Sequence, residues 1–546
     1  MRGLMMAFPL TVPALVRRAA SLFAHRPVSG RRPDRTITRT TYGDVLERVR
    51  RLGAALAGLG VRPGDRVATL AWASQEHLEA YLAIPSIGAV LHTLNLRLHP
   101  DDLAYIAHDA QDRVVIVDES LLPLLEQFRA RVPSIAHVVV IPSSAAERPL
   151  VRPDGFHDYE ALLASASPAA FREAALAEDD AAALCYTSGT TGQPKGVLYS
   201  HRALVLHSFA QGLADSLGIG ERDVVLPIVP MFHVNAWGLP FTGVLFGSGL
   251  VLPGPHLDGA SVLDLIVRER VSVTAGVPTV WLSMLQELDR APGTHDLSAL
   301  RMIAIGGSAA PPALIQAYQE RHGLCIVHAW GMTEVTPLGT VCLLPDALRD
   351  APLDEQVRYR ARQGKPIPLV ETRVIADGEE RPWDGASMGE LEVRGPWVAG
   401  QYFNHDGPDD RFSPDGWFRT GDVAVIHPDG CVELTDRAKD LVKSGGEWIS
   451  SVALENALMG HAAVAEAAVI AVPHPKWDER PLAVVALRPG TSASPDELRA
   501  YLSARFAKWW VPDEVRFVDA IPRTSVGKFR KSVLRDTYRE AYLGRQ

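Results

Sequence analysis

The sequence predicts an α/β protein with a large amino-terminal domain and a small α+β domain at the carboxyl end. Between Arg66 and Gly331, short apolar runs alternate with amphipathic stretches, which favours parallel-type sheets covered by helices. After about Gly364 the pattern changes to paired strands, which predicts a small β-barrel-like part. The length of 546 residues is too great for a single core and indicates several folding units.

Hydrophobic periodicity predicts the elements of the large domain in order. Strands are expected at Arg66–Leu70, Arg113–Val117, Asp223–Pro227 and Arg301–Ile305. Helices are expected at Ser74–Ile84, His201–Leu217, Ser261–Arg270 and Pro312–His322. Pro312 suits the first turn of the last helix, and Gly323 is typical of a helix end.

The domain boundary is predicted from a short polar segment. Asp422–Thr435 is typical of two strands joined by a turn at Pro428–Gly430, and Asp436–Asp440 follows it. We therefore expect a large domain over residues 1–436 and a small domain over residues 437–546. The small domain should contain helices Val452–His461 and Ser494–Ala507 and strands Val464–Val472, Leu482–Leu487 and Val515–Val518.

Composition limits the possible function classes. Hydrophobic residues make up 47% and charged residues 22%, as in ordinary globular proteins, and the net charge of −9 argues against a nucleic-acid binder. The longest apolar window, Pro240–Pro253, is too short to cross a bilayer, so we expect no integral membrane segment and at most transient membrane contact. Scattered cysteines favour reduced thiols in a cytoplasmic protein over disulfides or a zinc site: Cys185, Cys325, Cys342 and Cys431.

The run Tyr186–Val197 is the most informative part of the chain. Hydroxyl side chains, glycines that let backbone N–H groups converge, and one lysine gather in it: Thr187, Ser188, Gly189, Thr190, Thr191, Gly192 and Lys195. Such a loop, placed after the predicted strand Ala181–Cys185, suits a polyphosphate, although Ser/Thr/Gly-rich runs are also typical of solvated turns. It is not a Walker A loop, because Gly-Lys-Ser/Thr does not follow four residues after either glycine.

This run resembles, almost residue for residue, the phosphate loop of the adenylate-forming superfamily. That superfamily contains acyl-CoA synthetases, the adenylation domains of peptide synthetases and the beetle luciferases. The resemblance extends from about Phe8 to Tyr538 and is closest to medium-chain fatty acyl-CoA synthetases, including methylmercaptopropionate-type ligases.

Another matching segment follows the predicted strand Cys325–His328. The resemblance places Trp330 beside adenine, Gly331 among the nucleotide-binding residues, Thr333 on the α-phosphate and Glu334 on Mg²⁺. A hard cation prefers carboxylate oxygen and offsets phosphate repulsion as pyrophosphate leaves. Thr333 and Glu334 alone are also typical of a helix N-cap with an acidic first turn.

Two further segments complete the predicted nucleotide site. The resemblance makes Gly307 and Ser308 part of the wall beside adenine. It makes Asp422 the acceptor for both ribose hydroxyls and Arg437 a contact to ribose and phosphate, and two carboxylate oxygens do suit a vicinal diol. Without the resemblance, these residues would indicate a strand-end turn, a solvated Asp and a surface Arg.

The small domain carries the predicted catalytic lysine, Lys528. In the family this lysine contacts the acyl carboxylate and the α-phosphate, and a positioned ammonium favours attack of one anion on another. The resemblance also implies rotation about a hinge at Lys439. Rotation would replace Lys528 at the active site by Lys443, Gly445 and Gly446. The pantetheine arm of coenzyme A would then pass along this glycine-containing segment. Alone, a lysine in a polar loop would be solvated surface.

His233 gives the indication of substrate class. The resemblance places it beside the acyl carboxylate and the pantetheine tunnel, where amino-acid-activating relatives usually have Asp, so we expect a plain carboxylic acid. A buried structural His is the alternative. His328 departs from the family pattern, which often has Gln there. Pocket walls are expected from position alone at Trp237, Val277, Pro278 and Thr279.

Together these motifs predict an ATP-dependent, Mg²⁺-requiring acyl-CoA synthetase that releases AMP and pyrophosphate. Its expected substrate is a fatty acid, with medium chains favoured. The alternatives are a ligase for a short thioether or aryl acid, an enzyme that loads a free-standing carrier protein, a luciferase-like oxygenase, and a catalytically silent nucleotide-binding protein. The sequence leaves open the exact acid, the start codon (Met1, Met5 or Met6) and the oligomeric state, with a homodimer as one candidate.

Overall fold

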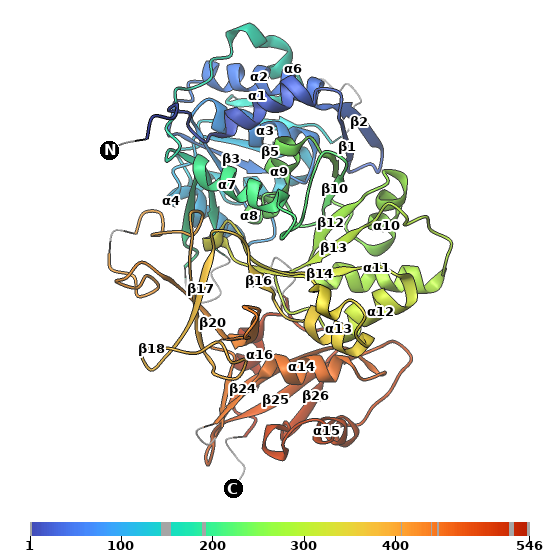
Figure 1. Cartoon of the computed structure of the whole chain (residues 1–546). Helices are drawn as coiled ribbons and strands as arrows, with labels where there is room; N and C mark the ends of the chain where they lie inside the picture. The colour runs from blue at the N-terminus through green and yellow to red at the C-terminus, as the bar shows by residue number, and fades with distance from the viewer. Residues whose placement is uncertain are drawn as a thin grey trace.

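The structure is a computed structural model that describes residues 3–143, 154–187, 193–405, 407–437, 439–444, 447–523 and 529–542. Figure 1 shows a large body, coloured blue to yellow, above a smaller carboxyl-terminal part in orange and red. The described strands form two large sheets, an antiparallel sheet and a carboxyl-terminal sheet.

Sheet one runs in the order β16-β15-β14-β13-β12-β10-β11-β1-β2. Its central neighbours from β14 to β1 are parallel, while β2, β15 and β16 pair antiparallel at the two edges. The bounds are β1 Pro27–Arg31, β2 Ile37–Thr41, β10 Val224–Pro227, β11 Gly249–Leu252, β12 Val273–Gly276, β13 Met302–Ile305, β14 Ile326–Gly331, β15 Leu338–Cys342 and β16 Lys365–Pro366.

Sheet two runs in the order β7-β6-β5-β3-β4-β8-β9, and only its last described pair, β8 with β9, is antiparallel. The bounds are β3 Arg66–Leu70, β4 Val90–Thr93, β5 Val114–Asp118, β6 His137–Ile141, β7 Phe156–Asp158, β8 Ala181–Tyr186 and β9 Gly196–Ser200. The main helices of the large body are α1 Val12–Leu22, α2 Tyr42–Gly58, α3 Gln75–Ser86, α4 Pro100–Asp109, α5 Leu122–Glu126, α6 Tyr159–Ser165, α7 His201–Gly212, α9 Leu239–Phe246, α10 Gly259–Arg268, α11 Pro278–Arg290, α12 Pro312–His322 and α13 Leu353–Arg360.

The large body is layered because both sheets are apolar on both faces. One core cluster joins their facing sides through helices, with Val114 of β5 and Val225 of β10 packed with Leu78 of α3. A second cluster covers the other face of sheet one, where Trp281 of α11 packs, and a third covers the other face of sheet two. Parallel sheets covered on both faces require such near-continuous apolar strands.

Sheet three is antiparallel in the order β18-β17-β19-β20-β21 and forms the β part predicted after Gly364. Its bounds are β17 Glu371–Ala376, β18 Glu379–Glu380, β19 Gly389–Arg394, β20 Phe418–Ile426 and β21 Val432–Arg437.

Sheet four runs in the order β23-β22-β25-β24, with β26 beside β25. Its bounds are β22 Val442–Ser444, β23 Glu447–Ile449, β24 Val464–His474, β25 Asp478–Leu487 and β26 Glu514–Phe517, with helices α14 Ser451–Met459, α15 Pro495–Ser503 and α16 Lys531–Tyr538. Leu454 of α14 and Leu498 of α15 belong to one of its cores, and Leu534 of α16 belongs to the other.

The predicted fold class is confirmed, and most predicted elements agree with the structure to within a few residues. The largest helix error is at α7, which ends at Gly212 and not at Leu217. Gly212 is a weak helix former, and Leu213 adopts extended backbone, so that the chain turns back and Ile219 N–H donates to the Gln211 carbonyl. The boundary between residues 436 and 437 stays a prediction.

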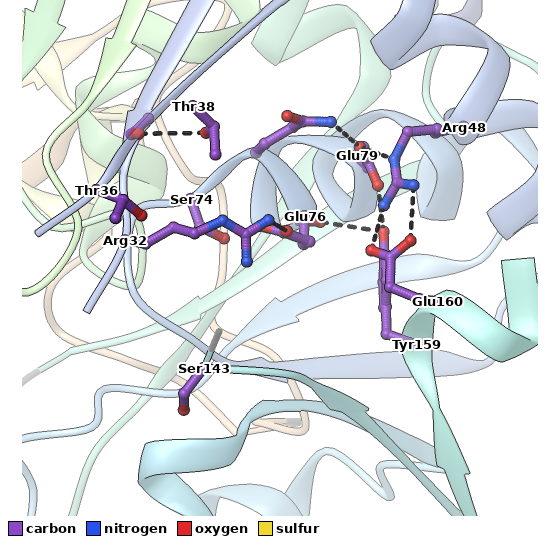
Figure 2. A network of polar contacts seen from close by, with 12 residues as sticks. Arg32, Thr36, Thr38, Arg48, Ser74, Glu76, Glu79, Ser143, Tyr159 and Glu160 are labelled. Carbon is purple, nitrogen blue, oxygen red and sulfur yellow. Dashed lines mark hydrogen bonds and ion pairs between the residues drawn. The ribbon is translucent and has the colours of Figure 1, made fainter. Parts of the chain in front are cut away.

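A partly buried polar network connects α2, α3 and α6. Figure 2 shows the Arg48 guanidinium between two carboxylates: its Nε lies 2.6 Å from Glu79 Oε1, and its terminal nitrogens bind both oxygens of Glu160. Tyr159 donates to Glu79 Oε2 over 2.6 Å. Burial raises the pKa of Glu79 to about 7, although Arg48 opposes that shift.

Candidate active site

The predicted phosphate loop connects β8 and β9, and its two ends are tied together. Thr187 N–H donates to the Lys195 carbonyl over 2.9 Å, and Lys195 N–H donates to Thr187 Oγ1 over 3.1 Å. Phe403 N–H donates to the Gly196 carbonyl over 2.8 Å, which brings the 400s segment against the loop. The other predicted members lie outside the described residues: Ser188, Gly189, Thr190, Thr191 and Gly192.

Lys195 points its ammonium at the segment that precedes β20. Its Nζ lies 2.7 Å from Asp409 Oδ2 and 4.5 Å from the centre of the Tyr402 ring. Neither Asp409 nor Tyr402 is among the site residues predicted from the sequence. Both lie in an irregular segment without hydrophobic periodicity, and only the fold reveals that they meet a lysine more than 200 positions away.

Trp330, Asp422 and Arg437 form one cluster. Trp330 Nε1 donates to Asp422 Oδ2 over 2.8 Å, and Arg437 Nε lies 2.8 Å from Asp422 Oδ1. Asp422 and Arg437 are also paired across β20 and β21. The Asp422 charge raises the pKa of Arg437 more than burial lowers it. The structure therefore unites three residues whose predicted contacts are adenine, ribose and phosphate.

Thr333 and Glu334 lie just beyond Gly331, the last residue of β14, in a buried single turn over Thr333–Val335. Glu334 Oε1 accepts from the Tyr402 hydroxyl over 2.7 Å, and its backbone carbonyl accepts from Ala399 N–H. The N-cap of this turn is Met332, so the alternative role of Thr333 as a helix N-cap is wrong. Strand β14 thus carries the Trp330 and Glu334 segments to one end of sheet one.

The predicted adenine wall follows β13. Gly307 has φ 81°, which suits glycine, and Ser308 is exposed. A Cβ on Gly306 would lie 2.8 Å from the Ala329 carbonyl oxygen and 3.0 Å from the Trp237 ring, so glycine permits both contacts. His328, in the neighbouring strand β14, is buried with Nδ1 2.9 Å from the Ala361 carbonyl, and burial lowers its pKa to about 4.

His233 precedes a left-handed turn, α8 Val234–Trp237. Four consecutive residues have φ between 46° and 57°, a conformation that costs L-residues energy. Gln211 Nε2 donates to the Trp237 carbonyl over 2.8 Å, and Cys185 Sγ lies 3.3 Å from Asn235 Oδ1. Of the other expected pocket walls, Val277 is the N-cap of α11 and Pro278 and Thr279 lie in its first turn.

The predicted catalytic residues of the small domain are only partly described. Lys443 lies on β22, with its ammonium 5.8 Å from the centre of the Trp448 ring and its N–H donating to Glu479 Oε2 over 2.9 Å. Gly445, Gly446 and Lys528 lie outside the described residues. Their predicted roles stay predictions.

Among the described residues, no group of three or more His, Cys, Asp or Glu side chains is arranged to hold a metal ion. Within the same ranges, no helix combines the length and apolar character needed to span a bilayer. The four cysteines are free thiols.

Two family models match the chain: "AMP-binding enzyme" over residues 17–403 and "AMP-binding enzyme C-terminal domain" over residues 453–528. The chain belongs to the AMP-binding enzyme family. Family membership confirms the resemblance inferred from the motifs.

Curated members of the AMP-binding enzyme family match over almost the whole chain. A long-chain-fatty-acid–CoA ligase of Thermus thermophilus is 49% identical over 99% of this chain and 98% of its own length. A 3-methylmercaptopropionyl-CoA ligase of Ruegeria lacuscaerulensis is 45% identical over the full length of both. A medium-chain-fatty-acid–CoA ligase of Ectopseudomonas oleovorans is 41% identical over 100% of this chain and 98% of its own.

Solved structures of AMP-binding enzymes share the fold. An anthranilate CoA ligase in complex with anthranoyl-AMP superposes with a TM-score of 0.87 at 28% identity, over 98% of this chain and 99% of that one. An o-succinylbenzoate CoA synthetase of Bacillus subtilis, in complex with its acyl-adenylate, gives 0.79 at 27% identity over 96% and 98%.

Proposed function

We propose that this AMP-binding enzyme is an ATP-dependent carboxylic acid–CoA ligase that activates a fatty acid, with medium chains favoured. The observation that carries the proposal is the convergence of Trp330, Asp422 and Glu334 at the end of β14. A nucleoside triphosphate requires groups of these three kinds: an aromatic ring for the base, a carboxylate for the ribose diol, and a carboxylate for the hard cation on the phosphates.

The predicted enzyme class, an AMP-forming acid–CoA ligase, is confirmed by the named relatives, and ATP and coenzyme A follow as its co-substrates. The relatives differ in their acids, which are long-chain, medium-chain and methylmercapto acids. A short thioether acid is therefore the second candidate substrate, favoured by the 45% identity to a 3-methylmercaptopropionyl-CoA ligase.

Glu334 fits a Mg²⁺ ion that is shared with substrate. Mg²⁺ is usually held by one or two carboxylates together with substrate phosphates, so a single buried carboxylate is a sufficient protein ligand. When bound, Mg²⁺ would supply positive charge beside the phosphates. Thr333 and Lys195 would bind the phosphates, and the nucleoside would be held by Trp330, Gly307, Ser308, Asp422 and Arg437.

The proposed reaction has two steps. The substrate carboxylate attacks the α-phosphorus, pyrophosphate leaves, and Lys528 stabilises the two anions as they approach. The coenzyme A thiol then attacks the acyl carbonyl and AMP leaves. His233 would border the acyl carboxylate, and Lys443, Gly445 and Gly446 would enter for the second step after rotation about Lys439.

Exchange of pyrophosphate into ATP, measured with a panel of carboxylic acids, tests the first step. We expect exchange with medium-chain fatty acids, and exchange with aryl acids alone would overturn the proposed substrate. Thioester formation with coenzyme A or with a free-standing carrier protein tests the second step. Acylation of the carrier but not of coenzyme A would establish the carrier-loading alternative.

We infer a cytoplasmic enzyme and treat a homodimer as a candidate assembly. Sedimentation at several protein concentrations would test the dimer. Cell fractionation would test the location.

A further inference from the structure

Tyr402 contacts two of the charged groups that the proposed mechanism places beside the phosphates, Glu334 and Lys195. Its hydroxyl donates to Glu334 Oε1 over 2.7 Å, and its ring centre lies 4.5 Å from the ammonium nitrogen of Lys195. The side chain is largely buried and packs edge-on against Phe412, with ring centres 5.7 Å apart. One aromatic side chain therefore contacts both a cation and a carboxylate.

Asp409 completes the arrangement on the side of Lys195. Its Oδ2 lies 2.7 Å from Lys195 Nζ, and its Oδ1 accepts from Arg411 N–H over 3.0 Å. The Asp409 side chain is 6% exposed, whereas that of Lys195 is 41% exposed. The anion is thus fixed by the fold, while the cation reaches towards it from the phosphate loop.

We propose that Tyr402 and Asp409 are positioning residues that keep Lys195 and Glu334 apart and aimed at substrate. Opposite charges in a partly buried site attract strongly and would otherwise pair with each other. Here Lys195 has an alternative carboxylate in Asp409 and an aromatic face in Tyr402. Glu334 is held through one oxygen, which leaves Oε2 for a cation. The proposal rests on the proposed roles of Lys195 and Glu334.

The chemistry of Tyr402 suits this role. Its hydroxyl is a hydrogen-bond donor, and it lies in a buried side chain 2.7 Å from the carboxylate oxygen Glu334 Oε1. Removing a group that hydrogen-bonds to a metal ligand typically lowers metal affinity by 10–100-fold. The Tyr402 hydroxyl should therefore affect metal binding, and its ring and Asp409 should affect Lys195.

Direct metal binding tests the role of the Tyr402 hydroxyl. Mn²⁺ is titrated by electron paramagnetic resonance in the presence of α,β-methylene-ATP. Tyr402→Phe removes the hydroxyl and keeps the ring, and we expect Mn²⁺ affinity to fall about tenfold. The matched control is Tyr359→Phe, because the Tyr359 hydroxyl also donates to a carboxylate, that of Asp429, but away from this site.

Steady-state kinetics test the role of Asp409. Asp409→Asn removes the charge that competes with ATP for Lys195 and loosens the orientation of the ammonium. We expect kcat and the KM for ATP to fall together by several-fold, with Mn²⁺ affinity unchanged. Damage that is only structural would raise KM and lower the thermal midpoint. Asp223→Asn is the control, because it breaks a similar pair between a largely buried aspartate and an exposed cation, Arg301.

Glu334→Gln separates the two levels of the proposal. If it abolishes Mn²⁺ binding while Tyr402→Phe leaves affinity unchanged, the positioning role of Tyr402 is wrong and the proposed function stands. If Glu334→Gln leaves Mn²⁺ affinity unchanged, the metal role assigned to Glu334 fails. If Tyr402→Phe does not fold, Asp409→Asn still tests the proposal, because an unchanged kcat and KM would overturn the positioning role of Asp409.

Discussion

The charged residues of the large body and those of the small carboxyl-terminal part are held in different ways. Glu334, Asp422 and Lys195 are each fixed by a side chain from a distant segment of the large body. Lys443 instead lies on the Trp448 ring of its own hairpin, and its backbone binds Glu479 of the neighbouring strand. The residues proposed to bind the nucleotide are thus fixed within one body, and the contacts of Lys443 lie within the other, so the proposed rotation would preserve both sets.

The two parts also share a contact at the predicted boundary. Asp436 Oδ2 accepts from both the N–H and the hydroxyl of Ser451, at the start of α14, over 2.6 Å each. Asp440, on the other side of Lys439, pairs with Arg535 of α16. Rotation about Lys439 would carry the Arg535 pair along and would separate Asp436 from Ser451. We therefore expect substitutions in the large body to affect adenylate formation, and substitutions of Lys443 or of the boundary contacts to affect thioester formation or the balance between the two steps.

The largest effect is expected from Glu334→Gln, which neutralises the carboxylate held by Tyr402. Loss of a group that stabilises transition-state charge typically costs about 10²–10³ in rate. We expect pyrophosphate exchange to fall by that order, and the exposed Glu320→Gln on α12 to leave it unchanged. Exchange within a factor of two of wild type would remove Glu334 from the mechanism.

A smaller and more selective effect is expected from Lys443→Ala. Thioester formation from preformed acyl-adenylate should fall about tenfold while pyrophosphate exchange remains, because only the second step needs this lysine. Lys476→Ala is the matched control, since Lys476 also lies over a tryptophan, Trp477, at 4.7 Å. Equal losses in both half-reactions would contradict the separation of the two parts.

Asp436→Ala should change the equilibrium between the orientation of the small part in this structure and the orientation after the proposed rotation about Lys439. Removing a side chain that binds the N–H groups of a helix start costs roughly 1 kcal/mol, equivalent to a several-fold change in an equilibrium. We expect the population of the present orientation of the small part to fall and the ratio of the two half-reaction rates to change several-fold. Asp354→Ala, an exposed acidic residue in the first turn of α13, provides the comparison. An unchanged ratio would show that this contact does not restrain rotation.

Glu79→Gln should change stability and leave both half-reactions unaltered. Burial raises the Glu79 pKa from 4.5 to about 7, so its neutral form favours folding below pH 4.5, and that contribution is lost as the pH rises to about 7. The variant should avoid that loss, which reaches roughly 3 kcal/mol in the free energy of unfolding at pH 7, because a shift of one pKa unit is worth about 1.4 kcal/mol. Denaturant unfolding from pH 4.5 to 7 measures it, with the half-exposed Glu160→Gln as control.

The same measurement on Glu455→Gln sharpens the comparison between the parts. Burial also raises the Glu455 pKa to about 7, and this residue pairs with Lys531 inside the small part. If the two parts unfold separately, each variant should shift only one transition. A single transition shifted by both would mean that the parts unfold together.

Local sequence pattern was sufficient for most of the fold. The helix Pro312–His322 has Pro at its start and Gly323 at its end, and the structure reproduces both bounds. The periodicity does not predict the end of α7, because a single glycine, Gly212, lowers helix propensity by a small amount within a run whose other residues tolerate a helix. Periodicity reports which face of an element is buried, and it reports little about where an irregular segment goes.

The candidate site shows the same limit. Motif resemblance selected Trp330, Asp422 and Arg437, which the structure brings together. It did not select Tyr402 or Asp409, because their partners are determined by tertiary folding. It could not reveal the left-handed backbone after His233 either, since four non-glycine residues in a row do not favour that conformation.

That left-handed turn has a practical consequence for engineering. At roughly 1–2 kcal/mol per residue, Val234–Trp237 stores on the order of 4–8 kcal/mol that the surroundings must offset. Gln211 and Cys185, from α7 and β8, supply part of that support. Copying only the tetrapeptide into another scaffold should let it relax to ordinary backbone, so a transplanted acid pocket must bring its supporting helix and strand along.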